Sequence, residues 1–377
     1  MKNIVNLGNV ATYINGYAFK PSDWAEDGTP IIRIQDLTGN SYQMNRFKGI
    51  VDSKYDVNSG DVLISWSASL GVYVWNRGNA VLNQHIFKVV FDKEEVDKDF
   101  FVFQIDNLLK RAANQAHGAT MRHLTKPVFD ALPFYLPDIK TQRLISSKLN
   151  LIVHLIEDHH EQLKKLDELI RSRFLEMFGE PWVNDKEFPC YSVGQVAESV
   201  TYGTSAPASD SGQYEYLRMN NLTDNGQLDL SDLKRIDMSD EQAEKYMVKK
   251  GDILFNRTNS IDLVGKTALF NLNNPMIIAG YLIRIRLSDK VNPVYFVAYM
   301  NMPYMKEKLR NIAKGAVNQA NINSKELKSI QILIPPLSLQ NEYCNFVLSI
   351  DKSKMAIQKS LDELETLKKS LMQTYFG

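Results

Sequence analysis

Residues 7–11 of the chain read Leu-Gly-Asn-Val-Ala, and residues 193–197 read Val-Gly-Gln-Val-Ala. Two further pairs recur downstream in the same order: GDVLI at 60–64 with GDILF at 251–255, and Phe-Gly at 178–179 with Phe-Gly at 376–377. The second copy follows about 190 residues after the first, a period far above that of solenoids or propellers. Each copy is therefore expected to fold as a domain of its own.

Length and composition agree with two domains. The 377 residues exceed what one core comfortably fills, and 44% hydrophobic content excludes a disordered chain. Cys190 and Cys344 lie in different halves without a Cys or His at metal-ligand spacing, so a disulfide framework or a zinc or other metal site is not expected. No uncharged run approaches the roughly 18 apolar residues of a membrane span. The expected location is the reducing cytoplasm.

Charge limits how the chain could bind nucleic acid. It holds 44 basic and 44 acidic residues, whereas dedicated DNA binders often have a pI above about 9. Affinity for DNA would have to come from local clusters or from partner proteins. The free chain is therefore expected to bind DNA weakly.

Short β-branched and aromatic runs bounded by Gly, Asn and Asp predict strands in both copies. These runs are residues 31–34, 62–65, 72–75 and 86–91 in the first copy and 214–218, 253–255, 266–270, 282–287 and 330–334 in the second. A helix capped by Asp99 is expected to run to Ala113, and another is expected to begin near Pro293. Both copies are thus mixed α+β.

After Pro137 and after Pro336 the pattern changes to one long helix in each copy. From Ile145, apolar residues recur at steps of three and four, which is typical of a coiled-coil seam. A helix over Thr141–Phe178 would be about 57 Å long. The predicted seam contains Ile145, Leu149, Ile152, Ile156, Leu163 and Leu166 in the first helix and Ile350, Ile357, Leu361 and Leu364 in the second.

Connectivity predicts how these helices are used. The first helix leads from one domain to the other, so the second, with the same seam period, should run antiparallel to it. The expected division is a domain at 1–140, a central helix at 141–180, a domain at 181–337 and a C-terminal helix at 338–377. The two helices would hold the domains at a fixed separation. The alternative, in which each helix folds back on its own domain, leaves a helix too long for that domain to cover.

A sequence that carries these motifs twice, in this order, resembles the specificity subunit of type I restriction-modification systems. The resemblance spans the chain and rests on LGNVATYINGYAF at 7–19 and VGQVAESVTYGTS at 193–205, on GDVLIS and GDILFN, on the joints LPDIKTQ and IPPLSLQ with Gln142 and Gln340 in one position, and on FLEMFGEPW.

The resemblance carries expectations about function. It implies two target-recognition domains, each reading one half of a bipartite double-stranded DNA site. It also implies helices that set the gap between the two half-sites and recruit two adenine methyltransferase subunits. Motor-nuclease subunits would complete the complex. S-adenosylmethionine, ATP and magnesium are expected on those partner subunits, and no cofactor on this chain.

Loop residues provide the candidate DNA contacts. Arg pairs with guanine and Asn or Gln with adenine through base edges, although half or more of protein–DNA hydrogen bonds go to phosphate and sugar. The candidates are Ser65, Trp66, Ser67, Gln84, His85, Arg122, His123 and Lys126 in the first copy and Asn256, Arg257, Thr258, Lys314, Asn318, Gln319 and Asn321 in the second. The repeated motifs are similar in the two copies, whereas these loop residues differ between them. This difference predicts that the two domains read different half-sites.

Catalytic signals are poor. Gly265-Lys266-Thr267 resembles the end of a phosphate-binding loop, but Ser260 stands where that loop needs a glycine. Residues 292–295, Asn-Pro-Val-Tyr, lack the second proline of the adenine methyltransferase motif. We expect no catalysis by this chain alone. Two alternatives stay open: a nuclease or methyltransferase with its own catalytic centre, and a protein-interaction scaffold that never contacts DNA.

Overall fold

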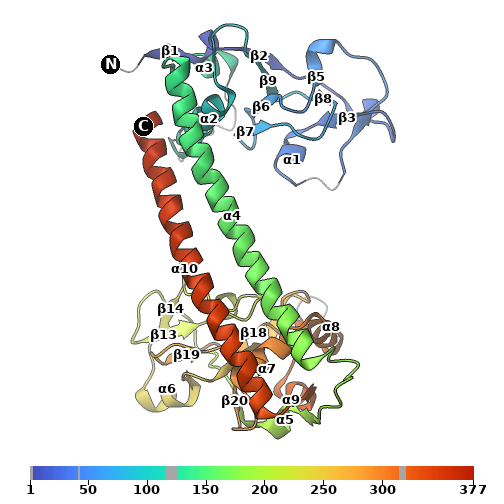
Figure 1. Ribbon diagram of the computed structural model, residues 1–377, viewed down its shortest axis with the longest axis vertical. Coiled ribbons are helices and arrows are strands. Elements are labelled where there is room, and N and C mark those ends of the chain that lie inside the picture. Colours follow the sequence, from blue (N-terminus) through green and yellow to red (C-terminus); the bar gives the residue numbers. More distant parts are fainter. Residues whose placement is uncertain (1–2, 41–42, 116–124, 314–319) are drawn as a thin grey trace. The chain divides into compact units, whose positions relative to one another are not determined.

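The structure is a computed structural model that describes residues 3–40, 43–115, 125–313 and 320–377 (Figure 1). The chain divides into unit 1, which comprises Met1–Asp158 and Ser360–Gly377, and unit 2, which comprises His159–Lys359. Each unit mixes strands with short helices and takes part of the long helices α4 (Ile139–Phe178) and α10 (Leu337–Phe376). The expected α+β class with two pseudo-symmetric domains and two long helices is confirmed.

Unit 1 contains two four-stranded sheets, in the orders β2-β9-β6-β7 and β4-β3-β8-β5, and a β1-β10 pair. Within the second sheet β3 and β8 are parallel, and all other pairings are antiparallel. The strands are β1 (Ile4–Asn6), β2 (Thr12–Asn15), β3 (Thr29–Ile32), β4 (Arg46–Phe47), β5 (Asp56–Val57), β6 (Val62–Ser65), β7 (Gly71–Val74), β8 (Ala80–Leu82), β9 (Ile86–Val90) and β10 (Pro133–Tyr135).

Unit 2 repeats this topology, with sheets β12-β20-β16-β18 and β14-β13-β19-β15 and a β11-β22 pair. It adds a short β17-β21 pair that has no counterpart in the described part of unit 1. The strands are β11 (Cys190–Ser192), β12 (Ala197–Tyr202), β13 (Tyr214–Leu217), β14 (Lys234–Ile236), β15 (Met247–Val248), β16 (Ile253–Asn256), β17 (Thr258–Asn259), β18 (Thr267–Leu269), β19 (Met276–Ile278), β20 (Leu282–Leu287), β21 (Ala320–Asn321) and β22 (Gln331–Leu333).

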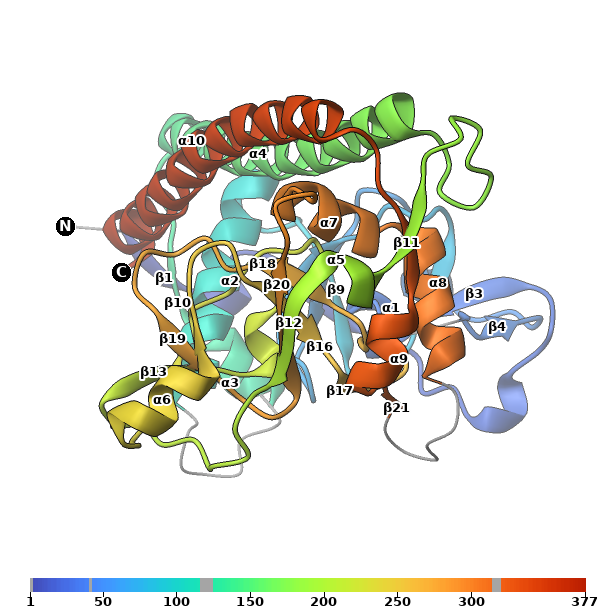
Figure 2. The ribbon, with the colours of Figure 1, turned by 90° about the horizontal axis from the view of Figure 1, so that it is seen from below.

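Further helices complete both units. Unit 1 has α1 (Ile34–Leu37), α2 (Lys98–Gln115) and α3 (Lys126–Asp130), and unit 2 has α5 (Val193–Val196), α6 (Asp240–Tyr246), α7 (Pro293–Met300), α8 (Pro303–Ile312) and α9 (Ser324–Ser329). Helix α7 starts at Pro293 as predicted and packs against β18 (Figure 2).

The predicted cap of α2 is wrong. The carboxylate of Asp97, not Asp99, accepts a hydrogen bond from the backbone N–H of Phe100 at 2.9 Å. Asp99 instead accepts one from the side-chain amide of Asn150 on α4, at 2.7 Å. Both aspartates fit the sequence preference for an N-cap, and the contact with α4 decides between them.

The repeated Gly-Asp motif has the same structural role in both units. Gly60 and Gly251 have φ of 100° and 98°, a turn conformation that favours glycine. The carboxylates of Asp61 and Asp252 each accept a hydrogen bond at 2.9 Å from the backbone N–H three residues earlier. Each also pairs with a cation on the next strand of the sheet, β9 or β20. The motif therefore starts β6 and β16 in a fixed geometry.

Each long helix is anchored in a core at both of its ends. Ile145 and Leu149, in the first turns of α4, lie in the core of unit 1, and Phe174, near its end, lies in the core of unit 2. Likewise Tyr343 of α10 lies in the core of unit 2 and Phe376 in the core of unit 1. Both helices are continuous over 40 residues.

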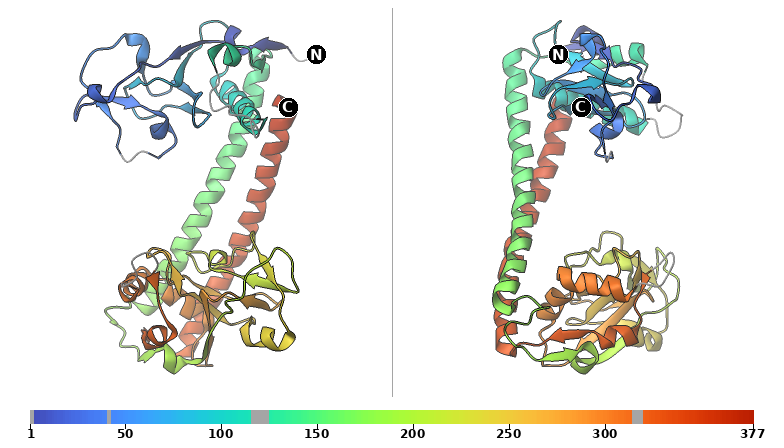
Figure 3. Two further views of the ribbon diagram at one scale, coloured as in Figure 1. Left: turned by 180° about the vertical axis from the view of Figure 1, so that it is seen from behind. Right: turned by 90° about the vertical axis from the view of Figure 1, so that its right-hand side faces the viewer.

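Within unit 2 the two helices lie side by side and run antiparallel (Figure 3). The hydroxyl of Tyr343 donates to the backbone carbonyl of Ile170 at 3.4 Å, and Lys354 pairs with Asp167 at 2.6 Å. Burial raises the pKa of the nearby Asp351, and the Lys354 ammonium opposes that shift. All ten predicted seam residues are buried or half-buried.

The joint sequences at the start of both long helices place a glutamine of the helix in an identical network. Gln340 is fully buried: its carbonyl accepts from the backbone N–H of Asn292, the N-cap of α7, at 2.8 Å, and its amide donates to the carbonyls of Lys290 and Pro335 at 3.2 and 2.8 Å. Gln142 repeats these bonds in unit 1. In unit 2 one side chain thus connects the long helix, the cap of α7 and the segment that follows β22.

Replacing Gln340 with alanine should destabilise unit 2 by roughly 2–4 kcal/mol, because buried backbone groups lose their partners. The free energy of unfolding is measured by urea denaturation, and hydrogen exchange of the β22 amides assigns the loss to unit 2. Ser338→Ala, at an exposed position two residues earlier, is the matched control and should change stability by less than about 0.5 kcal/mol. Equal stabilities of the two variants would contradict the assigned role.

Candidate functional site

In each unit three segments meet at one place: the end of β2 or β12, the residue after β6 or β16, and the residue before β9 or β20. The backbone N–H of Trp66 donates to the carbonyl of His85 at 3.3 Å, and that of Arg257 donates to the carbonyl of Tyr281 at 3.0 Å. These positions are therefore equivalent. We call them the strand-end clusters, which comprise Asn15, Trp66 and His85 in unit 1 and Tyr202, Arg257 and Tyr281 in unit 2.

In unit 1 the strand-end cluster is built around an indole. The Trp66 ring stacks on Phe87 with centroids 5.6 Å apart, contacts His85 edge-on, and its Nε1 donates to the side-chain oxygen of Asn15 at 3.2 Å. His85 has φ of 72°, which is uncommon for a residue other than glycine and is often found at functional sites. Gln84 precedes it and is half-buried.

In unit 2 the same positions hold a guanidinium and two phenols. The Arg257 Cζ lies 4.9 Å from the centroid of the Tyr202 ring, and Nη1 donates to the carbonyl of Gly280 at 3.4 Å. Nε is buried and has no partner among the described residues. The Tyr202 hydroxyl accepts from the backbone N–H of Ser324, at the start of α9, at 2.7 Å. Tyr281 is 49% exposed.

The β17-β21 pair adds a second attachment in unit 2. The carbonyl of Arg257 accepts from the backbone N–H of Ile322 at 2.8 Å, and the Thr258 hydroxyl donates to the side-chain oxygen of Asn321 at 2.8 Å. The backbone of Arg257 is thereby held on both sides, by Tyr281 and by Ile322. The position of the Arg257 Cα, from which the side chain extends, is therefore fixed.

Four of the candidate DNA contacts are buried and cannot reach a base in this conformation. Ser65 and Asn256 are 0% exposed, Ser67 is 5% exposed and Thr258 is 6% exposed. Every side chain of β6 and β16 is buried, so Ser65 and Asn256, which end these strands, also point into the protein. The Ser65 hydroxyl donates to the carbonyl of Ser69 and closes the following loop.

The other candidates fall into two groups. Trp66, Gln84, His85, Arg257 and Asn321 are half-buried and Lys126 is exposed, with its ammonium paired to Asp130 at 2.7 Å. Arg122, His123, Lys314, Asn318 and Gln319 lie outside the described residues. The sequence did not single out Asn15, Tyr202 or Tyr281. Tyr202 and Asn15 are equivalent because they pair with the same positions of β20 and β9. The sequence repeat alone does not align them, because β12 has one extra residue in a bulge.

No group of three or more His, Cys, Asp or Glu side chains that could hold a metal occurs among the residues the structure describes. The titratable groups of both strand-end clusters show no arrangement of a nucleophile with a base. The clusters instead present rings, amides and a guanidinium, which bind through hydrogen bonds and stacking.

Comparison with known proteins identifies the family. The sequence model described as the type I restriction modification DNA specificity domain matches residues 2–168 and 186–367. The chain belongs to this family. The model matches the chain twice, in agreement with the two units. The resemblance seen in the sequence is confirmed.

Curated relatives are specificity subunits. The chain is 23% identical to the type I restriction enzyme EcoBI specificity subunit of Escherichia coli, over 99% of this chain and 85% of that protein. It is 20% identical to the EcoKI specificity subunit of Escherichia coli strain K12, over 99% and 88%. The putative MjaX specificity subunit of Methanocaldococcus jannaschii is 29% identical over 48% of this chain and 43% of its own length.

Two solved structures share the fold. The crystal structure of the type I restriction-modification S subunit from M. genitalium superposes with a TM-score of 0.59 at 13% identity, covering 100% of this chain and 96% of that one. A chain from a study of complex assembly and conformational transition in the type I system also gives 0.59, at 16% identity, over 99% and 97%.

Family membership makes this chain a specificity subunit, a non-catalytic recognition component of a type I restriction-modification system. Such a subunit acts on DNA as part of a complex with other subunits. The expectation that the chain does not catalyse a reaction alone follows from this membership. Among the helices described, none is long and apolar enough to cross a membrane.

Proposed function

We propose that this specificity subunit reads an asymmetric bipartite DNA target, one half-site with each unit. The observation that supports the proposal is the pair of strand-end clusters. One backbone hydrogen bond is the same in both, from the N–H of Trp66 or Arg257 to the carbonyl of His85 or Tyr281. The side chains differ completely: Asn15, Trp66 and His85 in one cluster and Tyr202, Arg257 and Tyr281 in the other. A shared scaffold with unlike reading groups suits two unlike half-sites.

The accessible candidates divide by chemistry. Trp66, Gln84, His85, Arg257 and Asn321 carry groups that fit base edges or stacking, and Lys126 fits a phosphate. Arg122, His123, Lys314, Asn318 and Gln319, which lie outside the described residues, remain proposed DNA contacts. Because the chain has no net charge, most of its DNA affinity would come from the assembled complex.

The long helices would serve as spacer and docking surface. In the proposed division, residues 1–140 and 181–337 are target-recognition domains, and 141–180 and 338–377 fix the gap between half-sites. Two adenine methyltransferase subunits would dock on these helices, where Leu151 and Met355 are 61% and 74% exposed. Motor-nuclease subunits would join later, in the cytoplasm. S-adenosylmethionine, ATP and magnesium would bind to those partner subunits.

Reconstitution tests this function. Labelled methyl transfer from S-adenosylmethionine to plasmid DNA is measured with this chain, with its methyltransferase subunit, and with both together. Site-specific transfer is expected only from the mixture. Transfer by the chain alone would favour the enzyme alternative, and equal transfer by the methyltransferase with or without the chain would contradict a recognition role.

A further inference from the structure

We propose that Arg257 reads a guanine in the half-site of unit 2 and that Tyr202 is the residue that positions its guanidinium. The inference rests on the proposed function, because it assigns one base contact within the surface that reads DNA. It also predicts a difference between the half-sites, because Trp66 occupies the equivalent position of unit 1 and has no guanidinium fork.

The donors of Arg257 are only partly used within unit 2. Its Cζ lies over the Tyr202 ring, 4.9 Å from the ring centroid, and this cation–π contact uses no N–H donor. The carbonyl of Gly280 takes one donor at 3.4 Å, and no ion pair of Arg257 occurs among the described residues. Because Nε is buried, the parallel pair that remains consists of one N–H each of Nη1 and Nη2. This pair matches the O6 and N7 acceptors of guanine in the major groove.

The attachment of Arg257 favours a base contact over a phosphate contact. Arg257 is held at three points, through its backbone N–H to Tyr281, its carbonyl to Ile322 and its guanidinium to the Tyr202 ring. A phosphate contact needs positive charge but no fixed orientation, and both half-sites have the same backbone. The equivalent Trp66 is uncharged. The position is therefore preorganised and differs between units, as direct base readout requires.

Tyr202 is itself held in place by a hydrogen bond from α9. Its hydroxyl accepts the backbone N–H at the first residue of α9 at 2.7 Å, which fixes the ring at the end of β12. Tyr202 is 37% exposed. It acts on specificity through Arg257, so removal of its ring should weaken readout at the same base, while removal of its hydroxyl alone should have a smaller effect.

The test maps methylated adenines after expression of the complete complex with Arg257→Ala, Arg257→Lys or Tyr202→Ala. One base position in one half-site should become degenerate in all three, with discrimination reduced on the order of 10- to 100-fold for the arginine variants. Arg257→Lys is decisive because it keeps the charge and removes the fork. The other half-site and the gap should be unchanged.

Lys245→Ala is the matched control, because Lys245 also lies over an aromatic ring of unit 2, 5.4 Å from the centroid of Tyr246, but on α6. It should leave the motif intact. An unaltered motif in Arg257→Lys, or uniformly weaker methylation at every site in Arg257→Ala, would overturn the proposal and identify a phosphate contact. A wild-type complex without a defined motif would instead refute the proposed function itself.

Discussion

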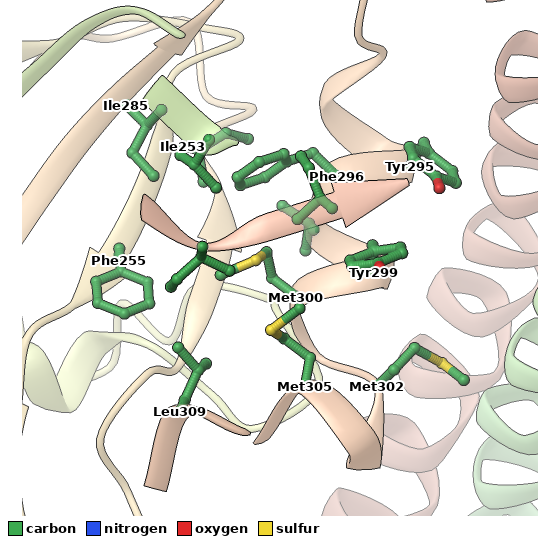
Figure 4. Close-up of a cluster of buried hydrophobic side chains, with 14 of the residues drawn as sticks. Ile253, Phe255, Ile285, Tyr295, Phe296, Tyr299, Met300, Met302, Met305 and Leu309 are labelled. Carbon is green, nitrogen blue, oxygen red and sulfur yellow. The ribbon is translucent and has the colours of Figure 1, made fainter. Parts of the chain in front are cut away.

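Phe174→Ala should lower the stability of unit 2 by about 3–5 kcal/mol, the range for truncating a fully buried phenylalanine. Phe174 is 1% exposed and joins α4 to the core of unit 2. Its ring stacks on Tyr295 with centroids 5.7 Å apart and meets Tyr343 of α10 edge-on at 5.5 Å. The same cluster continues through Tyr299 and Phe296 to the sheet residues Ile253 and Ile285 (Figure 4).

The change is measured by hydrogen exchange of the amides of β16 and β20 in the full-length chain, which reports on unit 2 separately from unit 1. Leu169→Ala provides the control, because Leu169 lies on the same helix and is 46% exposed. It should cost less than about 1 kcal/mol. A loss in Phe174→Ala no greater than in the control would show that α4 is not anchored in this core.

Removing seven residues from each long helix should shorten the preferred gap between half-sites by about three base pairs, since about 10 Å of helix is lost and base pairs rise about 3.4 Å. The proposed deletions are 153–159 in α4 and 362–368 in α10. They preserve the heptad spacing, the Asp167–Lys354 ion pair, and the core residues Leu149 and Phe376.

The gap is read by methylation of a set of targets whose half-sites are separated by graded spacings. The bases recognised should not change, because neither strand-end cluster is touched. A deletion in α4 alone is the control: it should abolish site-specific methylation, because the two helices would no longer match in length. An unchanged gap preference in the double deletion would count against the spacer role.

Local patterns in the sequence were sufficient for much of the fold. The Gly-Asp turns before β6 and β16, the start of α7 at Pro293 and the two long helices follow from φ preferences and from the three- and four-residue period. These features depend on residues close together in the chain. The prediction of the α2 cap was wrong because Asp97 and Asp99 are the same residue type, and only their contacts in the folded protein distinguish them.

The candidate site was less predictable, because it forms from segments distant in the sequence. Trp66, His85 and Arg257 were selected as polar or aromatic loop residues, but their grouping with Asn15 and Tyr202 depends on strand register. The sequence does not reveal that Ser65 and Asn256 are buried, because a polar side chain at a strand end can face either way. Burial of the whole strand decides that they face inward.

The most direct test of two unlike reading units is long-read mapping of methylated adenines in cells that express the wild-type complex. We expect one bipartite motif with two different half-sites and a single fixed gap. A palindromic motif, or one uninterrupted run of specified bases, would contradict it.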